Sequence, residues 1–397
     1  MRRTRSTLGA ALVAVMVLAG CQGQDAKSAD GDCDSGDAMK VGTILPITGA
    51  TADAGAAFTE GTKLAVDEIN ADGGVNGHCI EIIAKDEGND PTKSAQAASE
   101  LIDRDGVVAI IGPSGSGSVG AVAPIAKEAG VPFFHLAASR LSRSDAPLGF
   151  GMQITNDQIG PSFVEYAKKA GWSSLAVLAV NNTFGTSLLD STTAAAKEAG
   201  IDVVGNEVHE SGTVDLAPQV RTLRDKKPDA LVVASFGADA VAALKARLAV
   251  GWDVPVIGPS GLSYEEVVNG AGPEGIKGVL SSMYPRQLAA DPSTGKVSEA
   301  GEKLRAVLKK STGEDPLTIN VDSVAVAYDA VYALFTAFDG AGTDDAEKAA
   351  DHLISEGYDG VRANYRWTDQ DTAGFPLEAN SIVVAASLKD GVLTLAE

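Results

Sequence analysis

The segment VVAIIGPSGSGSVGAVAPIAKEAG, residues 107–130, indicates the fold class of the whole chain. Its first six residues are apolar and largely β-branched, which predicts a buried strand, and its last twelve have the pattern of an amphipathic helix. A loop of glycine and serine joins the two, so the strand delivers its loop to a helix N-terminus. Units of this kind build doubly wound α/β sheets.

The glycines of this loop have the spacing of a dinucleotide-binding turn, G-x-G-x-x-G, at Gly115, Gly117 and Gly120. That motif belongs to the first βα turn and needs an acidic residue after the next strand. Here the loop follows the third predicted strand, and no carboxylate follows the fourth strand before Asp145. A P-loop is excluded too, since Gly117 is followed by Ser118 and not by lysine.

A small anion is a better fit for the loop than a nucleotide. A helix N-terminus offers unpaired N–H groups and the positive end of the helix dipole. Ser114, Ser116 and Ser118 add hydroxyls, and the loop has no lysine or arginine to neutralise a polyphosphate. The alternative that the sequence leaves open is a flexible connection whose serines only cap the helix.

The alternation of strands and helices continues on both sides of this unit. Near-continuous apolar runs are typical of parallel strands covered on both faces, joined by right-handed βαβ connections. The motif IIGPSG at 110–115 returns as VIGPSG at 256–261, which suits two lobes built on one plan. Strands are expected at residues 41–46, 79–86, 107–112, 131–139, 174–180, 201–208, 230–235 and 254–258, and a late helix at 323–338.

The N-terminus resembles a bacterial lipoprotein signal. Three arginines precede a short apolar run that ends in Leu18-Ala19-Gly20-Cys21. Residues 1–20 are therefore expected to be removed and Cys21 to carry a lipid, with an ordinary signal or short anchor as the alternative. Residues 21–39 hold almost nothing apolar and are expected to form a flexible tether.

Charge and cysteine content fit an extracytoplasmic protein. The formal net charge is −21, and −24 without the three signal arginines, which opposes binding to nucleic acid or anionic lipid. With Cys21 lipidated, Cys33 and Cys79 remain as an even pair in an oxidising compartment. A disulfide between them is expected, and two free thiols are the alternative.

Several longer stretches together resemble the type I periplasmic binding proteins, specifically the leucine/isoleucine/valine and amide receptors of ABC importers. They are VGTILPITGATADAGAAFTEGTKLAVDEINADGGVNG (41–77), IIGPSGSGSVGAVAPIAKEAGVPFFHLAAS (110–139) and NNTFGTSLLD (181–190). The resemblance implies an α/β fold of two Rossmann-like lobes, with parallel sheets, helices on both faces and three crossings at a hinge. The first lobe would hold residues 40–155 and 285–360, and the second would hold 156–284 and 361–397.

The resemblance also implies site residues. In relatives that bind amino acids, a hydroxyl at the place of Ser116 holds the α-carboxylate. The carbonyl at the place of Ala138 takes the α-ammonium, and the hydroxyl at the place of Ser139 touches the ligand. The aromatic wall of the second lobe aligns with Phe184.

Other positions depart from the family pattern. The bulky aromatic of the first lobe becomes Ala54, and the carboxylate that often faces the ammonium aligns with Ser260. A family aspartate aligns with Asn156, beside Asp157. Either Asp157 or Asp239 then supplies the negative charge, or the ligand has no ammonium, because an unpaired buried ammonium is costly.

The expected function is that of a lipid-anchored solute receptor outside a bacterial cell, which delivers a small carboxylate-bearing solute to an ABC permease and its ATPases. A branched-chain or other apolar amino acid is the expected solute, and a sensory module for a similar acid or amide is the alternative. The protein is expected to be monomeric, without metal or organic cofactor. Catalysis is not expected, since the four histidines form no metal-spaced motif and His135 ends a predicted core strand.

Overall fold

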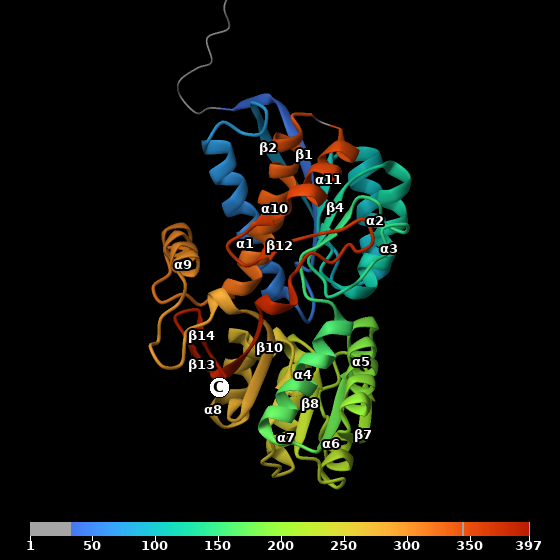
Figure 1. The fold of residues 1–397 in the computed structure, drawn as a ribbon, viewed down its shortest axis with the longest axis vertical. Coiled ribbons are helices and arrows are strands. Elements are labelled where there is room, and N and C mark those ends of the chain that lie inside the picture. Colours follow the sequence, from blue (N-terminus) through green and yellow to red (C-terminus); the bar gives the residue numbers. More distant parts are fainter. Residues whose placement is uncertain (1–32, 344, 397) are drawn as a thin grey trace, which may run out of the picture.

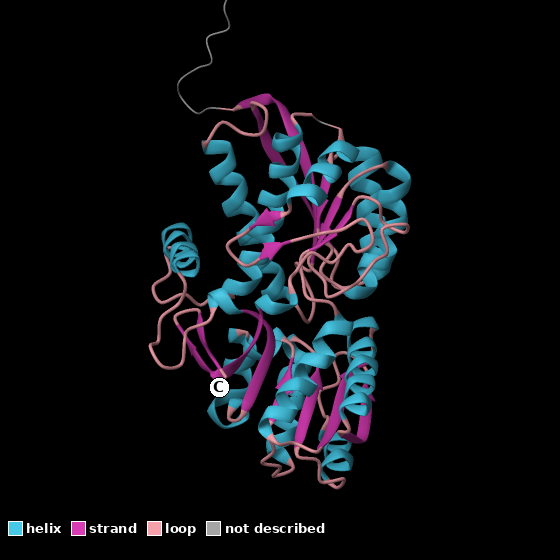
Figure 2. Cartoon of the chain, in the orientation of Figure 1, coloured by secondary structure: helices cyan, strands magenta, loops and turns pink. Residues whose placement is uncertain are grey.

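The computed structural model describes residues 33–343 and 345–396, which form two lobes stacked along the long axis (Figure 1). The predicted signal peptide, Cys21 and the tether up to residue 32 lie outside the described residues. Each lobe has a sheet with helices on both faces (Figure 2), as expected for an α/β fold of this kind.

The first lobe contains a parallel sheet of order β2-β1-β3-β4-β5. Helices α1, α10 and α11 pack together on one face, and α2 and α3 cover the other. A short antiparallel pair, β11 and β12, lies beside them. The strands are β1 (Asp34–Leu45), β2 (His78–Asp86), β3 (Ala109–Ile111), β4 (Phe133–His135), β5 (Gly149–Gly151), β11 (Tyr358–Asp359) and β12 (Asn364–Tyr365). The helices are α1 (Ala52–Ala71), α2 (Pro91–Ser99) with its π-helical continuation η1 (Glu100–Asp105), α3 (Ser116–Ala129), α10 (Val321–Ala341) and α11 (Ala346–Glu356).

The second lobe contains a sheet of order β14-β13-β10-β9-β8-β6-β7. Strand β13 runs antiparallel to both of its neighbours, β10 and β14. Helices α4 and α5 pack on one face and α6, α7 and α8 on the other. The strands are β6 (Ser174–Val180), β7 (Asp202–His209), β8 (Ala230–Ala234), β9 (Val256–Gly258), β10 (Val279–Pro285), β13 (Asn380–Lys389) and β14 (Val392–Leu395). The helices are α4 (Asn156–Ala170), α5 (Thr183–Ala199), α6 (Ala217–Arg224), α7 (Gly237–Ala249), α8 (Glu265–Ile276) and α9 (Glu299–Thr312), with short 3-10 turns η2 (Ser260–Ser263), η3 (Arg286–Leu288) and η4 (Leu377–Ala379).

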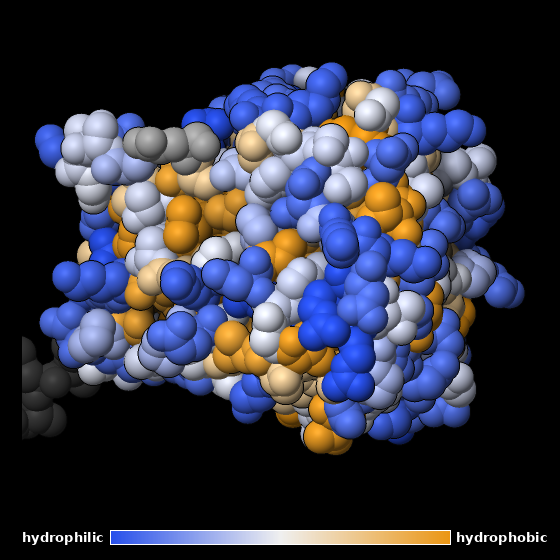
Figure 3. Space-filling model, turned by 90° about the horizontal axis from the view of Figure 1, so that it is seen from below, coloured by the Kyte–Doolittle hydropathy of each residue, from blue (hydrophilic) through white to orange (hydrophobic). Residues whose placement is uncertain are grey.

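Apolar burial follows the pattern that the sequence predicts. Every residue of β8 is buried, as is all of β6 after Ser174, because helices cover both faces of these central strands. Among the described residues, α10 is long and apolar enough to cross a membrane, but most of it is buried inside the molecule. This helix therefore has the burial of a core helix. Seen from the end of the second lobe, hydrophilic residues cover most of the surface (Figure 3).

The first strand starts earlier than predicted. Cys33 and Cys79, the two cysteines expected to pair, are joined by a disulfide with Cα atoms 5.0 Å apart. Next to it, Asp34 pairs with His78, so β1 includes the last six residues of the predicted tether, 34–39. The disulfide links the start of β1 covalently to β2. The polar composition of this segment alone would not place it in the sheet.

The chain crosses between the lobes three times, at residues 152–155, 313–320 and 376–379. Two of the expected boundaries differ from these positions. Residues 286–312, expected in the first lobe, contact the β13–β14 hairpin: Ala290 donates a backbone hydrogen bond to Leu393, and Arg305 pairs with Asp390 at 2.6 Å.

The last boundary differs as well. Residues 361–375, expected in the second lobe, pack on the first, where the Trp367 indole donates to the Gly151 carbonyl at 3.1 Å and the ring packs against Phe150. Their apolar side chains fill the edge of the first sheet, a contact that has no signature in the local sequence.

Candidate functional site

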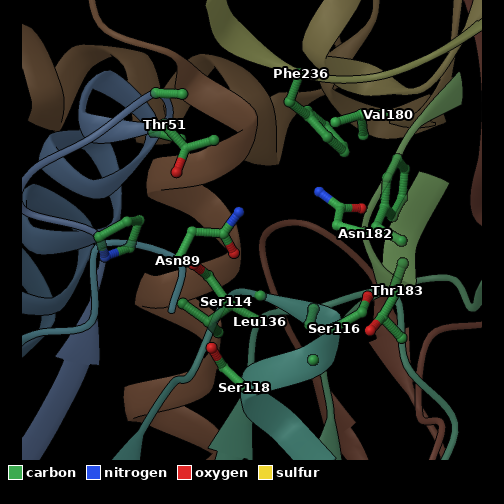
Figure 4. Close-up of a pocket in the computed structure, with 18 of the residues that line it drawn as sticks. Thr51, Asn89, Ser114, Ser116, Ser118, Leu136, Val180, Asn182, Thr183 and Phe236 are labelled. Atoms are coloured by element: carbon green, nitrogen blue, oxygen red, sulfur yellow. The ribbon is translucent and has the colours of Figure 1, made fainter. Parts of the chain in front are cut away.

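A cavity of about 160 Å³ lies between the two lobes. Its walls are built by loops that follow the carboxyl ends of strands in both sheets, the usual ligand position in parallel α/β sheets. Both G-P-S-G loops reach it, one after β3 and one after β9. Figure 4 shows Thr51, Asn89 and the α3 serines of the first lobe facing Asn182, Thr183 and Phe236 of the second.

The start of α3 has one serine hydroxyl left for a ligand. The backbone N–H and the hydroxyl of Ser114 both donate to one oxygen of Glu87, a fully buried carboxylate. The Ser118 hydroxyl lies 2.8 Å from the Ser94 hydroxyl, which donates to Glu87 at 3.0 Å. Ser116 lines the cavity, and its hydroxyl has no hydrogen bond to the described residues. The buried Glu87 thus holds the loop and leaves Ser116 for the solute.

Several helix N-termini converge on this cavity. Among the described residues, no side chain caps α3 at Gly115, α1 at Thr51 or α7 at Phe236, and all three of these residues line the cavity. In α5, by contrast, the Asn182 side chain accepts from the N–H of Gly185. Uncapped N-termini present unpaired N–H groups and positive potential, which favours an anion between them.

The second lobe supplies an aromatic wall. The rings of Phe184 and Phe236 lie 4.7 Å apart between centroids, and Phe236 lies 6.2 Å from Tyr264. Gly261 makes room for this wall, because a Cβ there would lie 2.1 Å from the Phe236 ring. The body of a bound solute would therefore meet apolar surface.

The hinge side of the cavity carries polar side chains. The Ser260 hydroxyl lies 3.3 Å from the Tyr264 hydroxyl, which accepts from Ser323 on α10 at 3.2 Å. Burial raises the pKa of Tyr264 to about 12, so its hydroxyl stays protonated at neutral pH.

Two acidic side chains line the cavity, and none of its described lining residues is lysine or arginine. Asp239 on α7 accepts from the Ser211 hydroxyl and the Gly212 N–H, each at 2.7 Å. Glu266 on α8 is hydrogen-bonded to Asp53 of the first lobe. Burial, together with this neighbouring carboxyl, raises the pKa of Glu266 to about 8. Glu266 is therefore mostly protonated at neutral pH, so Asp239 supplies the negative charge that lies with the positive helix ends in one cavity, as a zwitterion requires.

Four of the expected site residues line the cavity: Ser116, Ala138, Phe184 and Ser260. Ala54, which the sequence identified as a departure, lines it too, as does Asp239. The Ala138 carbonyl already accepts the backbone N–H of Asn156 at 3.0 Å, which leaves it one further lone pair for an ammonium.

The other three expected residues lie outside the lining of the cavity. Ser139 donates to the Ser116 carbonyl at 3.4 Å, so it contacts the ligand loop and not the cavity itself. Asn156 is buried at the start of α4. Asp157 pairs with Arg140 at 3.2 Å, with most of its side chain exposed, because the first turn of α4 points it away. Of the two aspartates proposed as the partner of an ammonium, Asp239 is the one in the cavity.

Sequence reasoning missed several lining residues. Two of them follow the carboxyl end of a strand, the usual position of ligand-binding residues in such sheets: Phe236 follows β8 and Gln153 follows β5. Asn89 lies in the loop before α2 and Thr183 is the first residue of α5, and the direction of both depends on packing. Glu266 lies on α8, a helix that the sequence did not predict. Within residues 33–343 and 345–396, no group of three or more histidine, cysteine, aspartate and glutamate side chains could hold a metal ion.

A family model described as periplasmic binding protein matches residues 38–379. The chain belongs to this family. The interlobe cavity lies where the resemblance implies a ligand cleft.

Individual relatives of this periplasmic binding protein are distant. It is 27% identical over 285 residues to Leu/Ile/Val-binding protein homolog 8 of Brucella abortus (strain 2308), covering 68% of this chain and 70% of the relative. The fold is similar to that of the branched-chain amino acid transporter substrate binding protein LivJ from Streptococcus pneumoniae in complex with isoleucine, with a TM-score of 0.77, 23% identity and coverage of 91% and 99%. It is also similar to an ABC transporter solute binding protein from R. palustris in complex with benzoate, with a TM-score of 0.76, 20% identity and coverage of 90% and 95%.

Proposed function

We propose that this protein captures a small carboxylate-bearing solute, in the first place an amino acid, between its lobes outside the cytoplasm and delivers it to an ABC permease. The observation that carries the proposal is the uncapped N-terminus of α3, where the free Ser116 hydroxyl faces the cavity between the lobes. Hydrogen bonds from N–H groups and a hydroxyl, with the helix dipole, favour one carboxylate there.

An amino acid also has an ammonium, and the acidic side of the cavity supports that choice. Asp239 lies in the first turn of α7, and the cavity lining contains no basic side chain. A carboxylate such as Asp239 would offset the cost of burying an ammonium. The aromatic wall of Phe184 and Phe236 suits an apolar body between the two charged groups.

The relatives are named for solutes of this kind. Isoleucine and benzoate, bound by the two similar structures, share a carboxylate and an apolar body but differ in the ammonium. The choice between an amino acid and a plain acid therefore depends on the acidic residues of this cavity.

Calorimetric titration with leucine, isoleucine, benzoate and 4-methylpentanoate, which is leucine without its ammonium, tests the proposal. Ser116→Ala is expected to weaken binding of every solute by about 1.5–3 kcal/mol, as for a lost hydrogen bond to a charged group. Asp239→Asn is expected to weaken leucine binding and leave 4-methylpentanoate unchanged. Unchanged affinity in Ser116→Ala would show that the carboxylate binds elsewhere.

The wider role follows from the same proposal. The mature chain would be held at the membrane by a lipid on Cys21, act as a monomer and carry out no catalysis. Labelled palmitate incorporated into the protein and lost in Cys21→Ser would support the anchor. Uptake of the bound solute in cells that contain the permease, and its loss on deletion of this protein, would support the transport role over a sensory one.

A further inference from the structure

Arg362 is a fully buried arginine at the hinge. Its guanidinium donates from Nε to Asp322 at 2.7 Å, from Nη1 to the Met152 carbonyl at 3.1 Å, and from Nη2 to the Gln153 side-chain oxygen at 2.7 Å. The guanidinium carbon also lies 4.5 Å from the centre of the Phe375 ring. Contacts in three directions fix the position of this guanidinium.

The partners of Arg362 come from the ends of different crossings. Met152 and Gln153 begin the first crossing, Asp322 lies at the start of α10 where the second crossing ends, and Phe375 precedes the third. Asp322 is as buried as Arg362, so the pair is shielded from solvent and holds the base of the hinge.

Gln153 connects this cluster to the cavity. It lines the cavity although only 5% of the residue is exposed. A glutamine amide has one acceptor oxygen and one NH₂ donor, whereas a guanidinium only donates. Arg362 therefore selects the amide orientation in which the oxygen faces the arginine. With its oxygen bound to Arg362, Gln153 has its NH₂ group free for a solute, since this group has no hydrogen bond to the described residues.

This donor is separated from the carboxylate site at α3. Gln153 follows β5 and Ser116 follows β3, and β4 lies between them. Two strand spacings amount to about 10 Å. The two residues are thus set to meet different atoms of one small solute.

We propose that Gln153, oriented by Arg362, donates a hydrogen bond to a second acceptor on the solute and makes the cavity selective for acids with an oxygen at the end opposite their carboxylate. This inference rests on the proposed function and narrows its solute class to acids or amino acids whose apolar body ends in an amide, hydroxyl or second carboxylate. In this arrangement Gln153 determines the specificity for the solute, and Arg362 positions the Gln153 side chain.

Matched solute pairs test the inference by calorimetry. Asparagine and leucine have side chains of the same shape, and 4-hydroxybenzoate differs from benzoate by one oxygen. The unaltered protein is expected to bind the oxygen-bearing member of a pair at least fivefold more tightly. Gln153→Glu keeps an oxygen for Arg362 but has no NH₂ group, and Gln153→Met removes the donor without adding charge. Both variants are expected to shift the affinity ratio of a pair by about tenfold toward the plain member.

Gln158→Glu is the matched control for the added charge. Gln158 lies in the first turn of α4, outside the cavity lining, where its side-chain oxygen accepts from Thr155, a role that glutamate performs equally well. Its affinity ratios are expected to equal those of the unaltered protein.

The outcomes separate the inference from the proposed function. If both Gln153 variants still bind the solutes and the affinity ratio within each pair is unchanged, Gln153 does not determine specificity. The proposed function would still stand. A thermal melt of each variant shows whether it is folded. No binding of any of the four solutes by the unaltered protein would contradict the proposed function itself.

Discussion

At the scale of single residues, the structure separates buried groups that serve the fold from those that face the cavity. His135 ends β4 in the core, fully buried, with Nδ1 3.1 Å from the Ala137 carbonyl and Nε2 without a partner among the described residues. Burial lowers the pKa of His135 from 6.5 to about 4. A histidine in this setting serves packing and is a poor candidate for a base.

The shifted pKa of His135 predicts an acid sensitivity. The unfolded chain takes up a proton below pH 6.5 while the folded protein does so only near pH 4, so the free energy of unfolding falls as the pH drops through this window. The contribution reaches about 3 kcal/mol at pH 4. Urea denaturation between pH 4 and 7 measures it, and His135→Asn, which keeps a donor near Ala137, is expected to have the shallower slope. Equal slopes for both proteins would refute this assignment.

At the scale of elements, loops at strand ends form the site, and the helices behind them decide which groups stay free. Glu87, just after β2, binds Ser114 and Ser94, so the serine-rich loop of α3 offers Ser116 to the cavity. The sequence predicted this loop and its chemistry. The loop's composition did not distinguish its three serines, because the competing acceptor is 27 residues away in the chain, and only the family resemblance singled out Ser116.

The disulfide makes a testable contribution to the first strand. Cys33 and Cys79 enclose a sequence separation of 46 residues, and the start of β1 lies beside them. Replacing both with serine is expected to lower the free energy of unfolding by about 2–4 kcal/mol, since the unfolded chain loses a loop constraint. Solute affinity is expected to remain unchanged because the bridge is remote from the cavity lining. Chemical denaturation and calorimetry of the double variant check both statements.

At the scale of the whole molecule, the lobes meet closely around the cavity. Gly237, at the start of α7, has φ of +51°, and a Cβ there would lie 2.1 Å from the Ala50 carbonyl of the first lobe. Carboxyl groups of Glu266 and Asp53 also meet across the lobes. Both contacts depend on closure of the two lobes over the cavity. Substitutions at these contacts therefore test lobe closure without changing the residues proposed to bind the carboxylate and the ammonium of the solute.

Gly237→Ala is expected to weaken solute binding at least tenfold, because the added methyl group obstructs approach of the lobes. Gly251→Ala is the control: this residue lies at the other end of α7 with φ of +64°, and a Cβ there meets nothing within 4 Å. Both variants carry the strain of a left-handed alanine, so a difference in calorimetric affinity reports the clash between lobes. Equal affinities would indicate that Gly237 has no role in closure.

The Glu266–Asp53 contact predicts that closure depends on pH. The pKa of Glu266 is raised to about 8 in this arrangement and is expected to return to about 4.5 when the lobes separate. Closure then takes up a proton between these values, so affinity falls as the pH rises from 4.5 to 8 and levels off above 8. Titrating leucine or benzoate over this range tests it, with Glu266→Gln expected to flatten the profile. Glu265→Gln, one residue earlier and outside the cavity lining, is expected to keep the slope.

Much of this protein follows from local sequence. Apolar runs and helix starts predicted every strand as far as residue 258 except β5, because burial on both faces of a parallel sheet leaves its mark on composition. Strands β5 and β10 and helices α8, α9 and α11 were not predicted. Strand β10 pairs with β13, which lies far later in the chain, and β5 is a three-residue strand, Gly149–Gly151, too short to leave an apolar run.

The sequence by itself determined the α/β class, the two-lobe plan, the cysteine pair and the serine loop that faces the cavity. Tertiary structure alone decided that residues 361–375 join the first lobe, that Asp239 and not Asp157 lies in the cavity, and that Arg362 orients Gln153. The physical reason is range: apolar periodicity and helix starts act over a few residues, whereas Arg362 and Gln153 are 209 residues apart. Such a hydrogen bond exists only once the whole chain has folded.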